Sequence, residues 1–205
     1  MQAEVLSVPY EIPLAGVSVC SLTSHTACAT TDEDGFFEIN VQPEEREGGL
    51  EVIALAMHRH GLHPTLMARQ APADGSFLTL HAMSNYIVQA NADHLGIDLD
   101  PNTGHALLSV DSRWLGAEGL VLDGEDLKDA IYTNDDGDFD RAQKAMSADG
   151  LVVSPNLAPG EHSLEVLDQG RARPCGSIWG VPDAGAGAAA WIEPGYVTVL
   201  EMVCL

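Results

Sequence analysis

Basic and aromatic residues are scarce in this chain of 205 residues. It has 9 Lys and Arg against 31 Asp and Glu, which gives a formal net charge of −22 at pH 7, and aromatic residues make up 5% of it. A surface of this sign repels nucleic acid and anionic membranes, so we expect neither as a partner. The acidic residues are dispersed along the chain. The simplest interpretation is a solvated acidic surface, and cation binding or adaptation to a saline environment are the alternatives.

Long apolar runs are absent as well. No stretch reaches the roughly 18 apolar residues of a membrane-spanning helix. The segment 1–15 lacks the basic region and the continuous apolar core of a signal peptide. Four cysteines that can form two pairs nevertheless indicate an oxidising compartment. We therefore expect a secreted, periplasmic or cell-surface protein from which an export signal has been removed.

What the chain does contain is the pattern of an all-β protein. Short alternating apolar segments are separated by turns rich in Asp, Gly and Pro. The lead-in 5–14 alternates but is broken by proline, which favours an edge strand. One stretch, 83–95, instead has helical spacing, with Ser84 as its N-cap and Gly96 after its end. Further strands are expected at 17–20, 27–31, 36–39, 50–57, 65–68, 77–81, 105–110, 120–122, 130–132, 151–153, 162–166 and 196–203.

These segments predict two antiparallel β-sandwich domains, transthyretin-like or immunoglobulin-like, joined by a short helix. The expected boundaries are 1–83 for the first sandwich, 84–104 for the helical connector and turn, and 105–205 for the second sandwich. The pattern of 31–37 returns at 147–153 as a hydroxyl residue, an Asp-Gly turn and an apolar strand. This weak internal repeat indicates that the two sandwiches are related.

The four cysteines favour one pairing. If the turn after the strand 17–20 centres on Ser24, Cys20 lies opposite Cys28, within reach of a disulfide. The alternative is a pair of buried free thiols. Cys175 and Cys204 share the second half, which offers no other partner. Cys20–Cys28 with Cys175–Cys204 is one of three pairings that four cysteines allow.

The first half also resembles a known family. The residues that carry the likeness are Gly16-Val17-Ser18-Val19-Cys20, then Cys28, then Thr31-Asp32-Glu33-Asp34-Gly35-Phe36-Phe37. They are similar to the carboxypeptidase regulatory-like domain, a transthyretin-like β-sandwich, and in particular to its cysteine-containing versions in secreted bacterial lipoproteins. The second half resembles the same superfamily more loosely, through 147–150 and 156–160. The resemblance implies a non-catalytic extracellular module with an accessory, adhesive or spacer role and no shared catalytic residues.

An acidic loop in the second half is a candidate calcium site. It offers side-chain oxygens at alternate positions, from Asn134, Asp136, Asp138 and Asp140. The loop is not an EF-hand, because Phe139 stands where that motif needs Gly and Ala145 where it needs a bidentate Glu. A looser calcium loop and a solvated acidic turn therefore remain as the two interpretations.

A histidine cluster in the first half is the second candidate metal site. His58, His60 and His63 form H-x-H-x-x-H, a spacing at which imidazoles can gather on zinc or copper. The alternative is a polar turn between two strands. Two further histidines, His94 and His105, flank the linker, and we expect both at the surface.

No motif for catalysis stands out, so we predict that the chain is not an enzyme. It contains no G-x-S-x-G, no H-E-x-x-H and no C-x-x-C. Trp114, Trp179 and Trp191 could form a platform for stacking sugars, although tryptophan is more often partly buried in a core.

The sequence thus predicts a non-catalytic secreted or surface-anchored module that acts in binding, spacing or assembly. The expected partner is a protein or a glycan at the cell surface, and self-association through edge strands is a further option. No cofactor is required in this interpretation. The alternative is an extracellular metal-binding protein that uses calcium at the acidic loop, or zinc or copper at the histidines.

Overall fold

A computed structural model of the chain describes residues 1–8, 10–22, 27–41, 44–46, 50–70, 77–111, 117–123, 129–177 and 188–204. These residues form mostly β-sheet with one short helix, as the sequence predicts. It divides into two compact units, residues 1–90 and 91–205, and the division falls inside the helix α1 (Asn85–Leu95). The domain boundaries given above, which place a connector at 84–104, stay a prediction. The described residues include no helix with the length and apolar character needed to span a bilayer.

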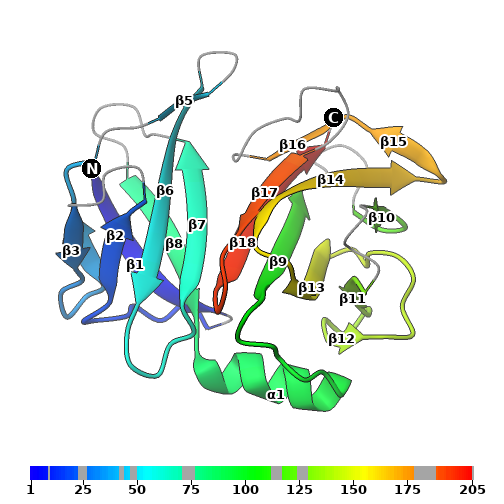
Figure 1. Cartoon of the computed structure of the whole chain (residues 1–205), viewed down its shortest axis with the longest axis horizontal. Coiled ribbons are helices and arrows are strands. Elements are labelled where there is room, and N and C mark those ends of the chain that lie inside the picture. The colour runs from blue at the N-terminus through cyan, green and yellow to red at the C-terminus, as the bar shows by residue number, and fades with distance from the viewer. Residues whose placement is uncertain are drawn as a thin grey trace. The chain divides into compact units, whose positions relative to one another are not determined.

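The first unit contains two sheets. In one, the central strand β1 (Gln2–Val8) pairs antiparallel with β4 (Phe36–Glu38) and parallel with β8 (Phe77–Met83). In the other, β2 (Ser18–Ser21) lies between β3 (Cys28–Thr30) and β6 (Leu50–His58), and β6 pairs in turn with β7 (Thr65–Gln70) and with β5 (Glu44–Arg46). Figure 1 shows β1 and β8 behind β2, β6 and β7.

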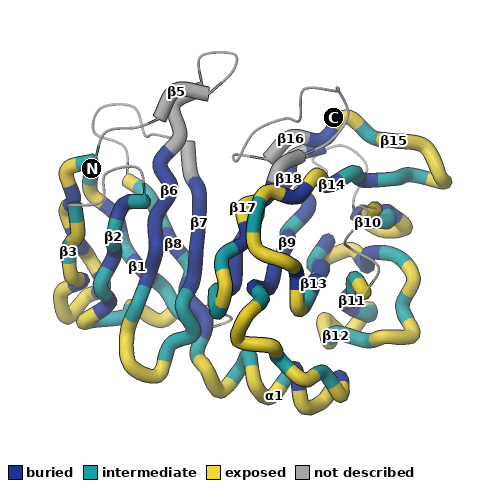
Figure 2. The backbone as a smooth tube through the Cα atoms, in the orientation of Figure 1, coloured by how far each residue is buried: buried dark blue, intermediate teal, exposed yellow. Residues whose placement is uncertain are grey.

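The core of the first unit follows the two-residue period of its strands. Ala3 and Val5 of β1 are fully buried, whereas their neighbours in the strand are not. The same alternation occurs in β2, where Val19 is buried and Cys20 lies on the opposite face. Other buried side chains come from the remaining strands (Figure 2): Phe37, Leu55, Met57, Met67, Leu80 and Ala82. The prediction that the lead-in forms an edge strand is wrong. Its residues 5–8 belong to β1, which is the central strand of its sheet.

The second unit also contains two sheets. One has β9 (Gly104–Asp111) at its centre, antiparallel to β13 (Leu151–Leu157) and parallel to β18 (Val197–Cys204). It continues through β11 (Ile131–Thr133) to β12 (Phe139–Asp140), and β16 (Cys175–Ser177) pairs with β18. In the other sheet the long strand β14 (Gly160–Asp168) pairs with three strands. They are β10 (Val121–Asp123), β15 (Arg171–Arg173) and β17 (Ala188–Ile192).

Each unit therefore pairs its first strand in parallel with its last strand. The two units also share a tight turn with the same hydrogen bonds, which precedes β4 in the first unit and β13 in the second. The Gly35 amide donates to Asp32 O at 3.1 Å, and the Gly150 amide donates to Ser147 O at 3.1 Å. The carbonyls of the two glycines accept from the amides of Val5 and Val110, each at 2.9 Å. Both glycines have positive φ (80° and 64°) where the turn lies against the strand, so the aligned Asp-Gly patterns form matching turns.

The helix has the ends that the sequence predicts. Ser84 Oγ accepts a hydrogen bond from the Ile87 amide at 3.1 Å, which caps the first turn. After Leu95 the Ile97 amide donates to Ala92 O at 2.8 Å, and Gly96 takes a positive φ of 63°. The helix buries only Ala92 and Leu95.

Candidate functional site

Both disulfides of the structure match the pairing favoured by the sequence. Cys20 and Cys28 stand directly opposite each other in β2 and β3, with 4.1 Å between their Cα atoms. Cys175 and Cys204 are opposite each other in β16 and β18, also with 4.1 Å between Cα atoms. No cysteine is free. Each unit is thus closed by one covalent bond between neighbouring antiparallel strands.

The acidic loop forms a tight hairpin turn between β11 and β12. Asn134 Oδ1 accepts from the amides of Asp136 and Asp138, both at 3.0 Å, and the Gly137 amide donates to Asn134 O at 3.0 Å. Asp32 Oδ1 caps the turn at 32–36 in the same way. At the end of the loop Asp140 Oδ1 accepts from the Ala142 amide at 2.8 Å.

Two of the four expected calcium ligands therefore already have an oxygen engaged with backbone amides, while Asp136 and Asp138 are exposed. In the part of the chain that the structure describes, no three His, Cys, Asp or Glu side chains are placed to hold a metal ion. Calcium binding at this loop stays a prediction.

The three clustered histidines lie along the connection between β6 and β7. His58 ends β6 opposite Ser18, His60 is exposed, and His63 is half-buried. Burial lowers the pKa of the His63 imidazole below its usual value, and a hydrogen bond with the Asn85 side chain partly offsets this effect. Zinc or copper binding by this cluster also stays a prediction.

The two histidines that were expected at the surface differ in their burial. His94 is exposed, but the surface prediction for His105 is wrong, because this residue is only 5% exposed. Its Nδ1 accepts a hydrogen bond from the Asn156 amide at 3.1 Å.

Trp191 is 42% exposed and its indole N–H donates to Glu193 Oε1. Trp114 and Trp179 lie outside the described residues, so the three-tryptophan platform stays a prediction.

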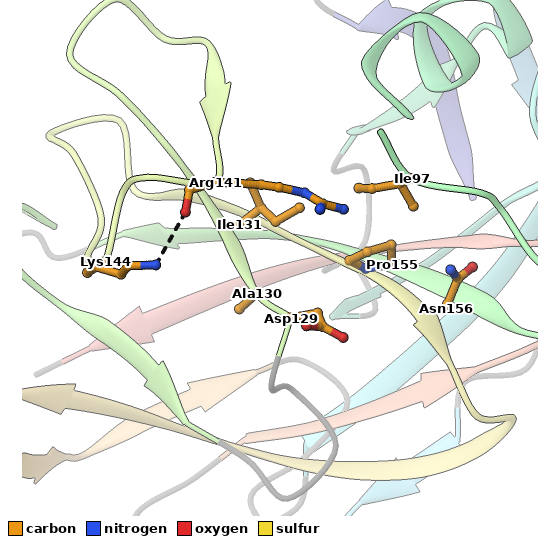
Figure 3. Close-up of a pocket in the computed structure, with 8 residues that line it drawn as sticks. All are labelled: Ile97, Asp129, Ala130, Ile131, Arg141, Lys144, Pro155 and Asn156. Carbon is orange, nitrogen blue, oxygen red and sulfur yellow. Dashed lines mark hydrogen bonds between the residues drawn. The ribbon is translucent and has the colours of Figure 1, made fainter. Parts of the chain in front are cut away.

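The candidate site that the structure adds is a pocket of about 360 Å³ in the second unit. Four segments that are distant in sequence line it: Ile97 after the helix, 129–131 at the start of β11, 141–144 after β12, and 155–156 in β13. Its apolar side chains are Ile97, Ala130, Ile131 and Pro155. Its polar side chains are Asp129, Arg141, Lys144 and Asn156 (Figure 3).

The charged groups of the pocket are not paired with each other. The Lys144 ammonium donates to Arg141 O at 3.3 Å. Within the described residues, neither the Arg141 guanidinium nor the Asp129 carboxylate has an ion pair or side-chain hydrogen bond. Figure 3 shows the guanidinium reaching toward Ile97 on one side of Pro155 and the Asp129 carboxylate on the other side. The pocket therefore presents donors and an acceptor of opposite charge, with apolar side chains between them.

Asn156 fixes the wall of this pocket. It has a positive φ of 55°, where the pairing of β13 with β9 shifts register. Its side-chain Oδ1 accepts from the Asp100 amide at 2.9 Å, and its Nδ2 donates to Asp98 O at 2.8 Å. With the bond from its own amide to His105, these contacts bind the segment 98–103 to β13. Asparagine tolerates this left-handed conformation better than most residues, and the hydrogen bonds of its side chain hold it there.

Sequence reasoning missed the pocket residues. The only linear signal is that two of the nine basic residues, Arg141 and Lys144, are three positions apart directly after an acidic turn. Nothing in the sequence places Asp129 or Ile97 beside them. The pairing of β11 with β12 and β13 positions Asp129, and the hydrogen bonds of Asn156 hold the segment that follows Ile97.

Comparison with known proteins gives no family. No protein-family model matches the chain, and no curated protein sequence matches it. Among solved structures, the Bacillus anthracis TIE protein is 12% identical with a TM-score of 0.27, and the match covers all of this chain but 33% of that one. The shaft pilin SpaA of Lactobacillus rhamnosus GG, as its E269A/D295N double mutant, is 11% identical with a TM-score of 0.29, and the match covers 100% of this chain and 97% of the pilin.

A Streptococcal ancillary pilin is 14% identical with a TM-score of 0.26, and that match covers 100% of this chain and 62% of the pilin. The chain spans about a third of the length of the TIE protein. The likeness to all three is weak, so it supports no statement about the function of this chain. The carboxypeptidase regulatory-like resemblance stays a prediction.

Proposed function

We propose that this chain is a non-catalytic module of the extracellular or cell-surface environment, in which two β units act in binding, spacing or assembly. The observation that carries the proposal is that all four cysteines are paired in two cross-strand disulfides. Such bonds persist in oxidising compartments and are rare where cytosolic thiols keep cysteines reduced. The strongly acidic composition adds solubility for a protein exposed at high concentration at a surface.

The architecture supports a mechanical interpretation of this role. Each disulfide joins two strands that already pair in a sheet, so it prevents those strands from separating when the chain is pulled or transiently opened. Each unit also holds its first strand in the interior of a sheet between two partners. Rigid units of this kind are suited to present a binding surface or to set a distance between neighbouring domains.

The test is the redox state of the chain in the cells that make it. Cells are quenched in acid, and the denatured chain is reacted with a maleimide coupled to a polymer large enough to shift its mobility. We expect no adduct before reduction and four after it, because the chain has four cysteines and all are bonded. The variant Glu118→Cys, at an exposed position, provides the control for labelling and should give one adduct before reduction.

A second experiment determines whether the chain is outside the cells that make it. Protease added outside intact cells should digest the surface-displayed chain, or the chain should be found in the culture fluid. Free thiols in the freshly quenched chain, or complete protection from external protease with none of the chain in the fluid, would contradict the proposal.

A further inference from the structure

The pocket of the second unit combines opposite charges with several apolar side chains. We propose that it binds a small zwitterion of the amino-acid type, with a carboxylate, an ammonium group and an aliphatic side chain. This inference concerns the residues 97–156 alone and holds whether or not the chain is exported.

The size of the pocket fits such a ligand. Its volume of about 360 Å³ lies in the range of roughly 300–1,000 Å³ that small-molecule pockets occupy. It is also at the small end of that range, which favours a molecule of the size of one or two amino acids over a longer chain. Four of its eight lining residues are apolar. A ligand with an aliphatic body gains from covering Ile97 and Pro155, which are partly exposed beside the buried Ile131.

Arg141 is the group that would take the carboxylate. Its guanidinium presents N–H donors in a fixed fork that matches the two oxygens of a carboxylate. Those donors have no side-chain partner within the described residues, and Figure 3 shows the group extended over the apolar residues. Lys144 adds a second positive charge and is tethered to the carbonyl of Arg141 by its own hydrogen bond.

Asp129 is the group that would take the ammonium. It lies at the start of the segment that enters β11 and has no ion pair within the part of the chain that the structure describes. In Figure 3 its carboxylate and the Arg141 guanidinium are on different sides of Pro155. In the proposed complex the ligand lies across Pro155, with its carboxylate toward Arg141, its ammonium group toward Asp129 and its side chain toward the apolar residues.

The charge of the surroundings favours a zwitterion over a simple anion. The chain carries a formal charge of −22, and the exposed carboxylates of Asp135, Asp136 and Asp138 belong to the turn that immediately precedes Arg141. A plain anion is repelled by this field, whereas a ligand of zero net charge is not. A plain cation would find Asp129 but would also be placed beside Arg141 and Lys144.

The wall of the pocket is set before a ligand arrives. Asn156 is held by hydrogen bonds to Asp98, Asp100 and His105, in a backbone conformation that its neighbours impose. Pro155, beside it, has a fixed φ. A ligand that enters this side of the pocket therefore pays little for ordering the protein, which favours measurable affinity for a small molecule.

The test compares three molecules with the same aliphatic body in titrations followed by calorimetry and by NMR. They are leucine, isocaproate, which lacks the amino group, and isoamylamine, which lacks the carboxylate. We expect leucine to bind with a dissociation constant below about 10 mM and the other two to bind at least roughly tenfold more weakly, since each loses one charge-assisted contact.

Variants assign the two contacts. Arg141→Gln should weaken leucine binding by roughly tenfold or more, while Arg171→Gln, the same charge change at an exposed position in β15, should leave it unchanged. Asp129→Asn should remove the preference for leucine over isocaproate, and Glu118→Gln, at another exposed acidic position, should preserve it. All four positions are exposed, so the variants are expected to fold, and circular dichroism checks this.

Three results would overturn the inference. They are a dissociation constant for leucine above about 10 mM, equal binding of isocaproate and leucine by the unmodified protein, and equal loss of binding in the Arg141 and Arg171 variants. The last of these would show a response to overall charge and not a site. None of them bears on the redox test of the proposed function.

Discussion

Replacing Gly150 with alanine should destabilise the second unit far more than the same replacement at Gly119. Both glycines have positive φ, 64° and 81°, so the added methyl group is unfavourable at either position. They differ in what that methyl group meets. At Gly150 it would lie 2.5 Å from Val110 O and 2.8 Å from Ala117 Cβ, whereas at Gly119 no atom lies within 4 Å.

The expected magnitudes follow from these two contributions. A left-handed conformation costs an L-residue about 1–2 kcal/mol, so Gly119→Ala should lower the free energy of unfolding by about that amount. Gly150→Ala adds a collision with the backbone of β9, and crowding a packed site typically costs about 1–3 kcal/mol more. The backbone of β9 at Val110 cannot move away easily, because the Val110 amide donates a hydrogen bond to Gly150 O at 2.9 Å. The sum is about 2–5 kcal/mol.

Urea unfolding followed by tryptophan fluorescence measures this difference. All three tryptophans, Trp114, Trp179 and Trp191, belong to the second unit, so their signal reports its unfolding. Linear extrapolation gives the free energy for each variant, and an unchanged slope shows that only stability has changed. If the free energies of unfolding of the two variants agree to within about 0.5 kcal/mol, the turn does not approach β9 as closely as the structure shows.

Two further predictions concern the disulfides and a histidine. The chain-entropy model gives about 2.5 kcal/mol for the bond between Cys20 and Cys28 and about 3.5 kcal/mol for the bond between Cys175 and Cys204, because they span 8 and 29 positions. Cys→Ala double variants should lose these amounts in urea unfolding followed by circular dichroism, and the reverse order would contradict the model. His63 has a lowered pKa in the folded state, so the unfolded state binds more protons as pH falls. The contribution of His63 to stability is full above about pH 6.5 and is lost below it. His63→Gln should therefore reduce the difference in unfolding free energy between about pH 7.5 and about pH 5.5, and an unchanged difference would refute the assignment.

The sequence predicted most local features of this protein correctly. The strand expected at 50–57 is β6 (Leu50–His58), and the one expected at 196–203 is β18 (Val197–Cys204). The cap at Ser84 and the matching turns at Gly35 and Gly150 are also where the residues indicated. These features depend on a few consecutive residues, through backbone preferences and side-chain periodicity, so the linear pattern contains the necessary information.

The errors concern partners that are distant in sequence. The lead-in was expected at an edge, but it pairs with β8 across more than seventy positions and is central. The strand β12 has only two residues and cannot show a period, and β17 (Ala188–Ile192) begins with three alanines and has no alternation. His105 was expected at the surface because it flanks the linker, but β9 carries it into the interior, where its Nδ1 accepts a hydrogen bond from the Asn156 amide.

The sequence alone determined the all-β class, the acidic composition and the turns, because each of these depends on composition or on neighbours along the chain. It favoured the disulfide pairing that the structure shows, among three possible pairings. Only the tertiary structure decided which strands run parallel, and only it brought Asp129, Arg141 and Pro155 to one pocket. Sheet pairing selects partners by how their apolar faces fit together, and many pairings of the same strands satisfy the local pattern. A pocket lined by four separate segments exists only once one of those pairings has been chosen.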